Sequence, residues 1–356
     1  MRNRKQGKTK QKRVRQHRPP EGGVRLVSAG GTIEEVAAAA NVSTATVSRF
    51  FNAPELLKEK TAERIREVVQ RVNYVPNMMA GGLASNRSRL VAAAIPTFSH
   101  SIFSSTIQSL TDTLAEQGYS VMLALTGAGD EHVQRQLFAI VGRRPDGIIL
   151  TGTQLSEASR RQLQATGITT IETWDLPTHP IDLVVGLSHQ KVGVAIARRA
   201  LEWGRRRSFV ISATGPRALA RRTSFARTMV EAGAPDPSTA TFAGPTTFGK
   251  GRQAMADHWD GGGRPEVVVC SSDTAAHGAI EELARRGVRV PQDVGVIGFG
   301  DLEFASELSP SLTTVKIDGV AIGRRAAEFL MLRARGEKIL RPVIDIGFTL
   351  VERESG

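Results

Sequence analysis

The chain has 356 residues, more than one ordinary domain, and its 40% apolar and 23% charged residues are typical of folded globular proteins. The net charge is +12, but nine Lys or Arg residues lie within residues 1–18, where no acid occurs, and only +3 remains without them. The single cysteine, Cys270, excludes an internal disulfide and a Cys-rich zinc site and favours a reducing cytoplasm. No apolar run is long enough to span a membrane, and none follows the basic residues as a secretion signal requires.

Residues 1–31 predict a disordered basic arm, because the Lys and Arg residues lead into a loop-like stretch rich in Gly and Pro. Such an arm can bind nucleic acid by releasing counterions. A solvated tail, or an over-long start of the reading frame, explains the same composition equally well.

Residues 32–76 predict three short helices. Thr32 followed by Glu35 has the pattern of a capping box at the start of the first helix, and Ser43 is a good cap for the second. The second helix extends to Phe51 with Val47 directed toward a core, and a third helix over 59–73 closes that core. Two helices joined by a tight turn form a helix-turn-helix unit.

The second helix has a slim exposed face, because its first residues are small or hydroxylated. Such a face fits the DNA major groove, which is about 12 Å wide. We expect base-edge contacts from Thr44, Ala45 and Arg49, and phosphate contacts from Ser43, Thr46 and Asn52. Helix spacing alone is not specific, since other trios of amphipathic helices show it too.

Three motifs match the LacI/GalR family signature in order and spacing. They are Thr32-Ile-x-x-Val-Ala-x-x-Ala, Val42-Ser43-x-x-Thr46-Val47-Ser48-Arg49 and Asn73-Tyr74-x-Pro76-Asn77. The chain therefore resembles DNA-binding repressors of this family. The resemblance implies that Thr44, Ala45 and Arg49 read bases.

The resemblance also implies that residues 77–89 form a hinge helix and linker. Asn77 and the apolar wedge Leu83 would then contact the minor groove. Gly81 and Gly82 depart from the family pattern, and each costs about 1 kcal/mol of helix propensity relative to Ala. We expect a hinge that folds only on DNA.

From residue 90 to 356, short apolar runs alternate with helical stretches, which predicts parallel sheets covered on both faces. One sheet is expected from 90–96, 120–125, 146–150 and 169–172, with 183–185 at its edge and helices at 103–117, 131–142 and 156–166. After a helix over 190–203, a second sheet is expected from 208–212, 239–243, 267–270 and 294–299. A helix over 318–334 and a strand over 343–350 would cross back between the two lobes.

This α/β region resembles the two-lobed periplasmic-binding-protein-like core of the same family, which binds effectors and dimerises. Ligands of open α/β sheets lie beyond the carboxyl ends of the strands, so the cleft should be lined by loops at 97–103, 126–130, 151–154, 172–176, 214–222, 244–251 and 271–274. The expected effector residues are Ser99, Phe103, Trp174, Arg221, Phe248 and Asp273.

Arg221 and Asp273, facing each other across the cleft, would suit a polyhydroxylated ligand with a carboxylate. Arg221 could instead be a solvated charge at a helix start, and Asp273 a helix N-cap. The segments Asp182–Gly186 and Ile344–Leu350 most resemble gluconate-operon repressors, which implies a gluconate-like sugar acid. Ser272-Asp273 and Gly298-Phe299-Gly300-Asp301 depart from the usual family wording and leave the ligand class open.

No catalytic set is expected. The segment Gly244–Gly251 nearly matches a phosphate-binding loop, but Gly251 replaces the hydroxyl that would hold magnesium. The scattered histidines have no metal-ligand spacing, and no cofactor is expected. The remaining alternatives are a solute-binding protein of the same core fold, an enzyme using the Gly-rich loop, and a regulator of another sugar pathway whose ligand is a co-repressor or activator.

Only a DNA-binding function explains residues 32–83. The sequence therefore predicts a small all-α helix-turn-helix DNA-binding domain followed by an α/β two-lobed effector domain. We expect a cytoplasmic homodimer that binds operator double-stranded DNA and a small sugar-acid effector, with no membrane contact. No apolar heptad segment appears at the end of the sequence to suggest a tetramer.

Overall fold

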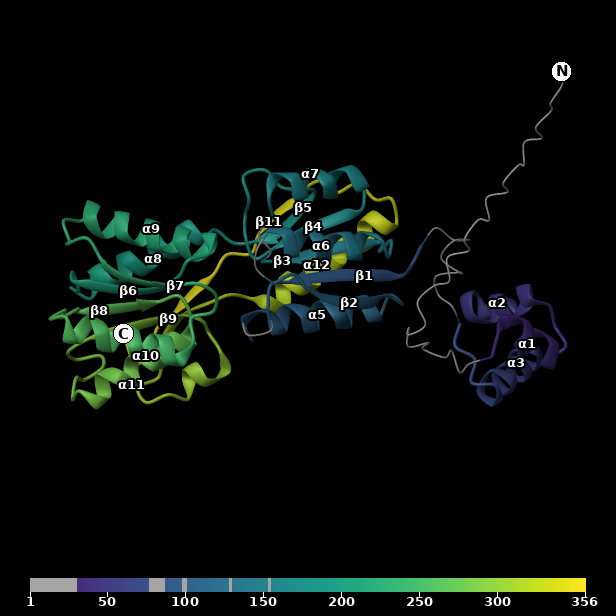
Figure 1. Ribbon diagram of the computed structural model, residues 1–356, viewed down its shortest axis with the longest axis horizontal. Coiled ribbons are helices and arrows are strands. Elements are labelled where there is room, and N and C mark those ends of the chain that lie inside the picture. The colour runs from purple at the N-terminus through teal and green to yellow at the C-terminus, as the bar shows by residue number, and fades with distance from the viewer. Residues whose placement is uncertain (1–30, 77–86, 98–100, 128–129, 153–154) are drawn as a thin grey trace, which may run out of the picture. The chain divides into compact units, whose positions relative to one another are not determined.

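The computed structural model describes residues 31–76, 87–97, 101–127, 130–152 and 155–356. The chain divides into two compact units, Met1–Gly81 and Gly82–Gly356, whose helices and strands are labelled in Figure 1. The division between the units falls within residues 77–89, which the sequence analysis assigns to the hinge and linker.

In the first unit, three helices surround a small apolar core: α1 (Ile33–Ala39), α2 (Thr44–Asn52) and α3 (Glu59–Arg71), with a 3-10 turn at Pro54–Leu56. The predicted capping box is present, because Thr32 Oγ1 accepts from Glu35 N at 3.2 Å and Glu35 Oε2 accepts from Thr32 N at 2.9 Å. The buried core consists of Val36, Ala37, Ala40, Val47, Ile65 and Val68.

The turn between α1 and α2 depends on Asn41, which has a φ of +49°. Asn adopts this left-handed conformation more readily than most residues, so the chain reverses there at low cost. At the other end of α2, the Phe51 ring lies 5.0 Å from Phe50 and 5.9 Å from Tyr74. These contacts join the end of α2 to the chain that follows α3.

The second unit begins with a six-stranded parallel sheet in the order β11-β5-β4-β3-β1-β2. Its strands are β1 (Leu90–Ile95), β2 (Ser120–Leu125), β3 (Gly147–Thr151), β4 (Thr169–Thr173), β5 (Leu183–Gly186) and β11 (Val343–Asp345). The helices of this lobe are α5 (Ser104–Ala115), α6 (Asp130–Val141), α7 (Glu157–Thr166) and α12 (Gly319–Ala334), with a 3-10 turn at Ser101–Phe103. Separate apolar clusters on the two faces of the sheet bury it on both sides.

The prediction that β5 lies at the edge of the first sheet is wrong. β11 pairs in parallel with β5, with Val343 opposite Val184, so the edge strand comes from the end of the chain. Every residue of β5 is buried, as expected for an apolar run inside a parallel sheet.

The second sheet has the order β12-β10-β9-β8-β6-β7. Its strands are β6 (Ser208–Ala213), β7 (Ser238–Phe242), β8 (Val267–Cys270), β9 (Gly295–Gly300), β10 (Thr313–Lys316) and β12 (Thr349–Val351). Figure 1 shows it between two layers of helices, α8 (His189–Glu202) with α9 (Pro216–Glu231), and α10 (Phe248–Asp260) with α11 (Asp273–Arg285). A 3-10 turn at Glu303–Ser306 follows β9.

The single strand predicted over 343–350 is in fact two short strands. β11 joins the first sheet, and β12 joins the second sheet antiparallel to β10, with Val315 opposite Leu350. Gly347, with a φ of +73°, lies in the link between them. The predicted crossing between lobes is present. The strand β10 was not predicted.

The two lobes of the second unit are connected three times by the chain: from β5 to α8, from β10 to α12 and from β11 to β12. One buried apolar cluster continues from the α5 and α12 face of the first sheet to the α8 and α9 face of the second. Within the described ranges, no helix combines the length and apolar character needed to cross a bilayer.

Candidate functional site

The first unit presents the beginning of α2 on its surface. Ser43 caps this helix, since its Oγ accepts from Thr46 N at 3.2 Å, and it also lies 2.9 Å from Thr46 Oγ1. Thr44 and Ala45 are exposed, whereas Val47 is fully buried in the core. The exposed face of α2 therefore begins with small side chains, as predicted.

Arg49 lies one helical turn after Ala45 and is exposed. The described part of the chain offers its guanidinium no hydrogen bond or ion pair, so it is available for an external acceptor. Asn52 is differently placed, because its side-chain amide donates to Ser48 O at 2.9 Å and lies 3.3 Å from Ser48 Oγ. Asn77 and Leu83 lie outside the described residues.

In the second unit, a polar cluster forms where the carboxyl ends of strands from both lobes meet. Arg221 of α9 donates from Nη1 to His189 Nδ1 at 2.9 Å, and its guanidinium lies 3.8 Å from the centre of the Phe299 ring. His189, at the start of α8, donates from Nε2 to Trp174 O at 2.8 Å. This chain of contacts joins α9 and β9 of the second lobe to the end of β4 in the first.

His189 is neutral in this cluster. Burial, followed by the nearby positive charges of Arg221 and Arg217, lowers the pKa of His189 to about 2. Burial, and then repulsion by Arg217, lowers the pKa of Arg221 to about 9, so Arg221 stays charged at neutral pH. The alternative that Arg221 is a solvated charge does not describe its position, since it is half-buried against a ring and a neutral imidazole.

Two predicted aromatic residues pack beside this cluster. Phe103 and Trp174 are both buried, with ring centres 5.1 Å apart in an edge-to-face arrangement. The Trp174 indole donates from Nε1 to Thr106 Oγ1 at 3.0 Å. Trp174 has a φ of +69°, an uncommon conformation for a bulky residue and one that is costly to hold.

Arg217 is a member of the cluster that the sequence analysis missed. It extends from α9 toward the first lobe, with Nε 3.9 Å from Asp175 Oδ2 and the guanidinium 5.8 Å from the Phe103 ring centre. Gly152, which has a φ of +73°, lies against it, and a Cβ there would collide with Arg217 Nη2. Both arginines lie in the stretch 214–222 that the sequence predicts as a cleft loop, and two positive charges in one such loop were the signal that would have found Arg217.

Asp273 is fully buried within the second lobe. One carboxylate oxygen accepts from Thr314 Oγ1 and the other from Leu302 N at 2.7 Å, and burial raises the pKa of Asp273 to about 6. Ser272, not Asp273, caps α11, because Ser272 Oγ accepts from Ala275 N at 3.2 Å. The alternative of an N-cap role for Asp273 is therefore wrong.

The prediction that Arg221 and Asp273 face each other across the cleft is also wrong. Both belong to helices of the second lobe, Arg221 to α9 and Asp273 to α11, on opposite faces of its sheet. Phe299 connects them, because its backbone N–H bonds to Asp273 while its ring lies under Arg221. Phe248 is half-buried at the start of α10 with its ring 4.9 Å from that of His277, and Ser99 lies outside the described residues.

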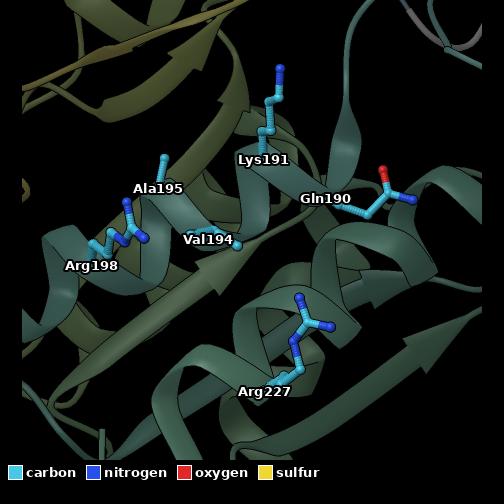
Figure 2. A pocket seen from close by; sticks show the side chains of 6 residues that line it. All are labelled: Gln190, Lys191, Val194, Ala195, Arg198 and Arg227. Carbon is cyan, nitrogen blue, oxygen red and sulfur yellow. The ribbon is translucent and has the colours of Figure 1, made fainter. Parts of the chain in front are cut away.

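A separate hollow of about 420 Å³ lies between α8 and α9. Figure 2 shows Lys191 and Arg198 extending from α8 and Arg227 from α9. Close approach of the two helices at Gly193, where a Cβ would collide with Arg221 O, sets this part of their packing. None of the predicted effector residues lines the hollow, so the cluster around Arg221 remains the candidate effector site.

Comparisons with known proteins agree with both parts of this description. The model for bacterial regulatory proteins of the lacI family matches residues 32–77, and the model for the periplasmic binding protein-like domain matches residues 187–356. Over 326 residues the chain is 32% identical to the HTH-type transcriptional regulator GntR of Pseudomonas aeruginosa, covering 91% of this chain and 95% of that protein.

Two solved structures support the fold. A LacI family transcriptional regulator from Silicibacter pomeroyi matches with a TM-score of 0.85 at 28% identity, over 91% of this chain and 98% of that one. A Lac repressor dimer bound to operator and the anti-inducer ONPF matches with a TM-score of 0.80 at 22% identity, over 92% and 99%. These relatives are DNA-binding regulators and not enzymes, so the prediction of a non-enzyme is confirmed. The chain belongs to the LacI family of bacterial transcriptional regulators.

Proposed function

We propose that this regulator is a cytoplasmic homodimeric repressor of a palindromic operator, controlled by a small gluconate-like sugar acid. One α2 helix of each subunit enters the major groove of one half-site. Arg49 forks onto a guanine, Thr44 and Ala45 contact neighbouring base edges, and Ser43, Thr46 and Asn52 hold phosphates. Asn77 and Leu83 extend the contact into the minor groove.

The charge balance of the Arg217 and Arg221 cluster is the observation that carries the effector proposal. Both guanidiniums are half-buried, and the described residues place one carboxylate near them, Asp175, whose Oδ2 lies 3.9 Å from Arg217 Nε. The other polar partner of the two guanidiniums, His189, is neutral. A site with this excess of positive charge favours an anionic ligand over a neutral sugar.

The carboxylate of the ligand takes the place of weaker acceptors. Arg221 now donates to an uncharged imidazole, and a carboxylate accepts such a bond about twice as strongly. The hydroxyls of a sugar acid find acceptors and donors in Asp175, Thr106 and the Trp174 indole. Within the cluster, the indole now donates to Thr106, and Asp175 lies near Arg217. Phe103 and Trp174 supply the apolar faces against which the carbon chain packs.

Entry of the ligand loosens the contacts that Arg217 makes with the first lobe. Arg217 reaches Asp175, Phe103 and Gly152 from the second lobe, so a ligand between them changes how the lobes are held together. Operator and effector then compete through the relative rotation of the lobes, and each lowers the binding affinity of the other by the same factor. Induction by the ligand is the direction we propose.

The test uses the full-length protein with DNA from the promoter of its own gene and a scrambled duplex. Calorimetric titrations with D-gluconate, and with D-glucose and D-ribose as neutral controls, measure the effector preference. We expect that, of these three compounds, only gluconate binds the protein and causes it to release the promoter DNA. Arg221→Gln should abolish the gluconate binding that releases the promoter DNA, whereas Arg227→Gln, further along the same helix, should leave it unchanged.

Two outcomes would overturn different parts of the proposal. Equal affinity for promoter and scrambled DNA would refute operator recognition. Binding of glucose or ribose in preference to gluconate would refute the sugar-acid effector and leave the DNA-binding part intact.

A further inference from the structure

A cavity of about 580 Å³ lies at the amino ends of strands β1, β3 and β4 in the first lobe. We propose that this cavity is a second ligand site, which binds a small hydroxylated metabolite carrying a phosphate or carboxylate. The bound ligand stabilises the end of the linker that leads from the DNA-binding unit. Its volume is within the roughly 300–1,000 Å³ of small-molecule sites. The proposal adds a site to the one around Arg221 and does not depend on the identity of that effector.

The cavity lies at the amino ends of the strands, and the proposed effector site lies at their carboxyl ends. Asp146, directly before β3, lines the cavity, whereas Gly152, directly after β3, contacts Arg217 of the effector cluster. A strand rises about 3.3 Å per residue, so the five residues of β3 separate the two places by roughly 17 Å. One small ligand cannot touch both.

The walls of the cavity also hold the end of the linker. Ser88 donates from N and from Oγ to Asp146 Oδ1 at 2.8 and 3.0 Å, and Arg89 N donates to Asp146 Oδ2 at 3.0 Å. Arg87 donates from Nη2 to Ala334 O at 2.6 Å. Arg87, Asp146 and Ala334 all line the cavity, so a ligand there touches the groups that fix the chain where it enters β1.

The remaining lining defines the chemistry of the ligand. Arg144 is exposed at the cavity, and the described residues give its guanidinium no ion pair or hydrogen bond, which leaves it free for an oxyanion. Arg333 adds a second positive charge, although it also pairs with Asp182 at 2.7 Å. Tyr119 stays a hydrogen-bond donor, because burial and the Asp146 carboxylate raise the pKa of its hydroxyl.

Hydroxyl and apolar groups complete the site. Thr169 lines it and offers a partner for a hydroxyl of the ligand, and Ile168 provides an apolar surface, whereas the hydroxyl of Thr166 already donates to Leu163 O. Leu330 approaches the sheet closely because β3 begins with Gly147, where a Cβ would collide with Leu330 Cδ1. Positive charge, hydroxyls and a small apolar wall together suit a sugar phosphate or a sugar acid better than a neutral sugar.

The experiment titrates the full-length protein, and the same protein carrying Arg221→Gln to remove the effector site, with D-glucose 6-phosphate, D-gluconate, inorganic phosphate and D-glucose, so that its arms separate phosphate from carboxylate. Arg144→Asn removes the free guanidinium and keeps a residue that tolerates the φ of +48° at this position. Ala334→Leu fills the cavity without changing its charge. Arg143→Asn is the matched control, because Arg143 is adjacent and exposed but does not line the cavity.

We expect one of the two hydroxylated anions to bind, with Arg144→Asn and Ala334→Leu each weakening the affinity by about tenfold or more. Arg143→Asn should bind as the unchanged protein does. Binding at this site should persist in Arg221→Gln, which removes the other site. Hydrogen exchange at the Ser88 and Arg89 amides should slow when the ligand is present.

Four results would overturn the proposal. They are no binding of either hydroxylated anion at millimolar concentration, binding to the Arg221→Gln protein that survives both cavity variants, loss of all binding in Arg221→Gln, or exchange at Ser88 and Arg89 that is the same with and without ligand. Because Arg144 is exposed, its replacement tests the site even where the cavity-filling variant folds poorly.

Discussion

Arg221 donates a hydrogen bond to His189 across 2.9 Å, although a half-buried guanidinium would be better matched by a carboxylate. The imidazole accepts this bond only because its other nitrogen donates to the carbonyl of Trp174, which fixes the tautomer. The pair therefore joins the second lobe to the end of β4 and leaves Arg221 with a weak, exchangeable acceptor. An anionic effector could replace that acceptor without breaking an ion pair.

Replacing His189 with Gln should change how folding stability depends on pH. The folded-state pKa of about 2 is below the ordinary 6.5, so the unfolded chain takes up a proton below pH 6.5 while the folded chain does not. The stability that His189 contributes is therefore fully present above pH 6.5 and falls as the pH falls, by about 1.4 kcal/mol per pH unit.

Urea denaturation of both proteins at neutral pH and at about pH 5 measures this effect. The Gln variant should be the less stable at neutral pH, by about 1–2 kcal/mol for the altered hydrogen bonds, and should lose that deficit in acid. Asp273, whose raised pKa of about 6 acts in the opposite direction, is common to both proteins and cancels in the comparison. His179→Gln, at an exposed position, is the control, and a pH-independent difference for His189→Gln would contradict the assignment.

Gly152→Ala should separate backbone strain from displacement of Arg217. Gly152 and Gly167 both have positive φ, +73° and +67°, but a Cβ meets Arg217 only at Gly152 and meets nothing within 4 Å at Gly167. Both Ala variants should lose roughly 1 kcal/mol of stability from strain. Only Gly152→Ala should also weaken binding of the acidic effector, as measured by calorimetry. Equal effector affinity in the two variants would show that the position of Arg217 does not matter.

Arg49→Ala should weaken binding to the operator by about 1–3 kcal/mol and relax its base preference at one position. The reason is that this exposed guanidinium has no partner among the described residues and lies on the face of α2 opposite the buried Val47. Fluorescence anisotropy with operator and random duplexes measures both affinities. Arg161→Ala, exposed on α7 in the other unit, is the control. A loss of equal size on random DNA would mean that Arg49 contacts phosphate rather than a base.

Removal of residues 1–18 should lower affinity for every DNA sequence alike and reduce the dependence of affinity on salt. The segment carries nine positive charges and no negative ones, and each phosphate contact contributes about 0.9 to the slope of log affinity against log salt. Binding measured over a range of salt concentrations gives that slope for the truncated and complete chains. An unchanged slope would favour a solvated tail.

The features that the sequence predicted well depend on residues close together in the chain. The capping box of Thr32 and Glu35, and the cap at Ser43, are local patterns, and the structure confirms both. The long apolar strands are recognisable for the same reason. By contrast, β11 and β12 have three residues each and exist only because distant strands, β5 and β10, pair with them.

The candidate effector site was predictable only in part. Phe103, Trp174 and Arg221 were expected and lie together, because each follows the carboxyl end of a strand. Asp273 has the same kind of position in the sequence, but its carboxylate is used by Thr314 and Leu302, and β10, which carries Thr314, was not foreseen. The partners of a side chain cannot be predicted from local spacing when they lie on a strand that was not itself predicted.

Asp146→Asn tests whether the attachment of the linker transmits the effector signal. The carboxylate accepts three hydrogen bonds from Ser88 and Arg89, and the isosteric amide keeps one good acceptor and adds a donor that faces the Ser88 and Arg89 N–H groups. We expect the second unit to lose about 1–3 kcal/mol of stability, and the change in operator affinity caused by effector to shrink, while effector binding itself is retained. Asp236→Asn, at an exposed position, controls for the loss of one charge. If effector changed the operator affinity of the Asp146→Asn protein as much as that of the unchanged protein, the contacts of Asp146 with Ser88 and Arg89 would only support the fold. The signal from the effector would then reach the DNA-binding unit without them.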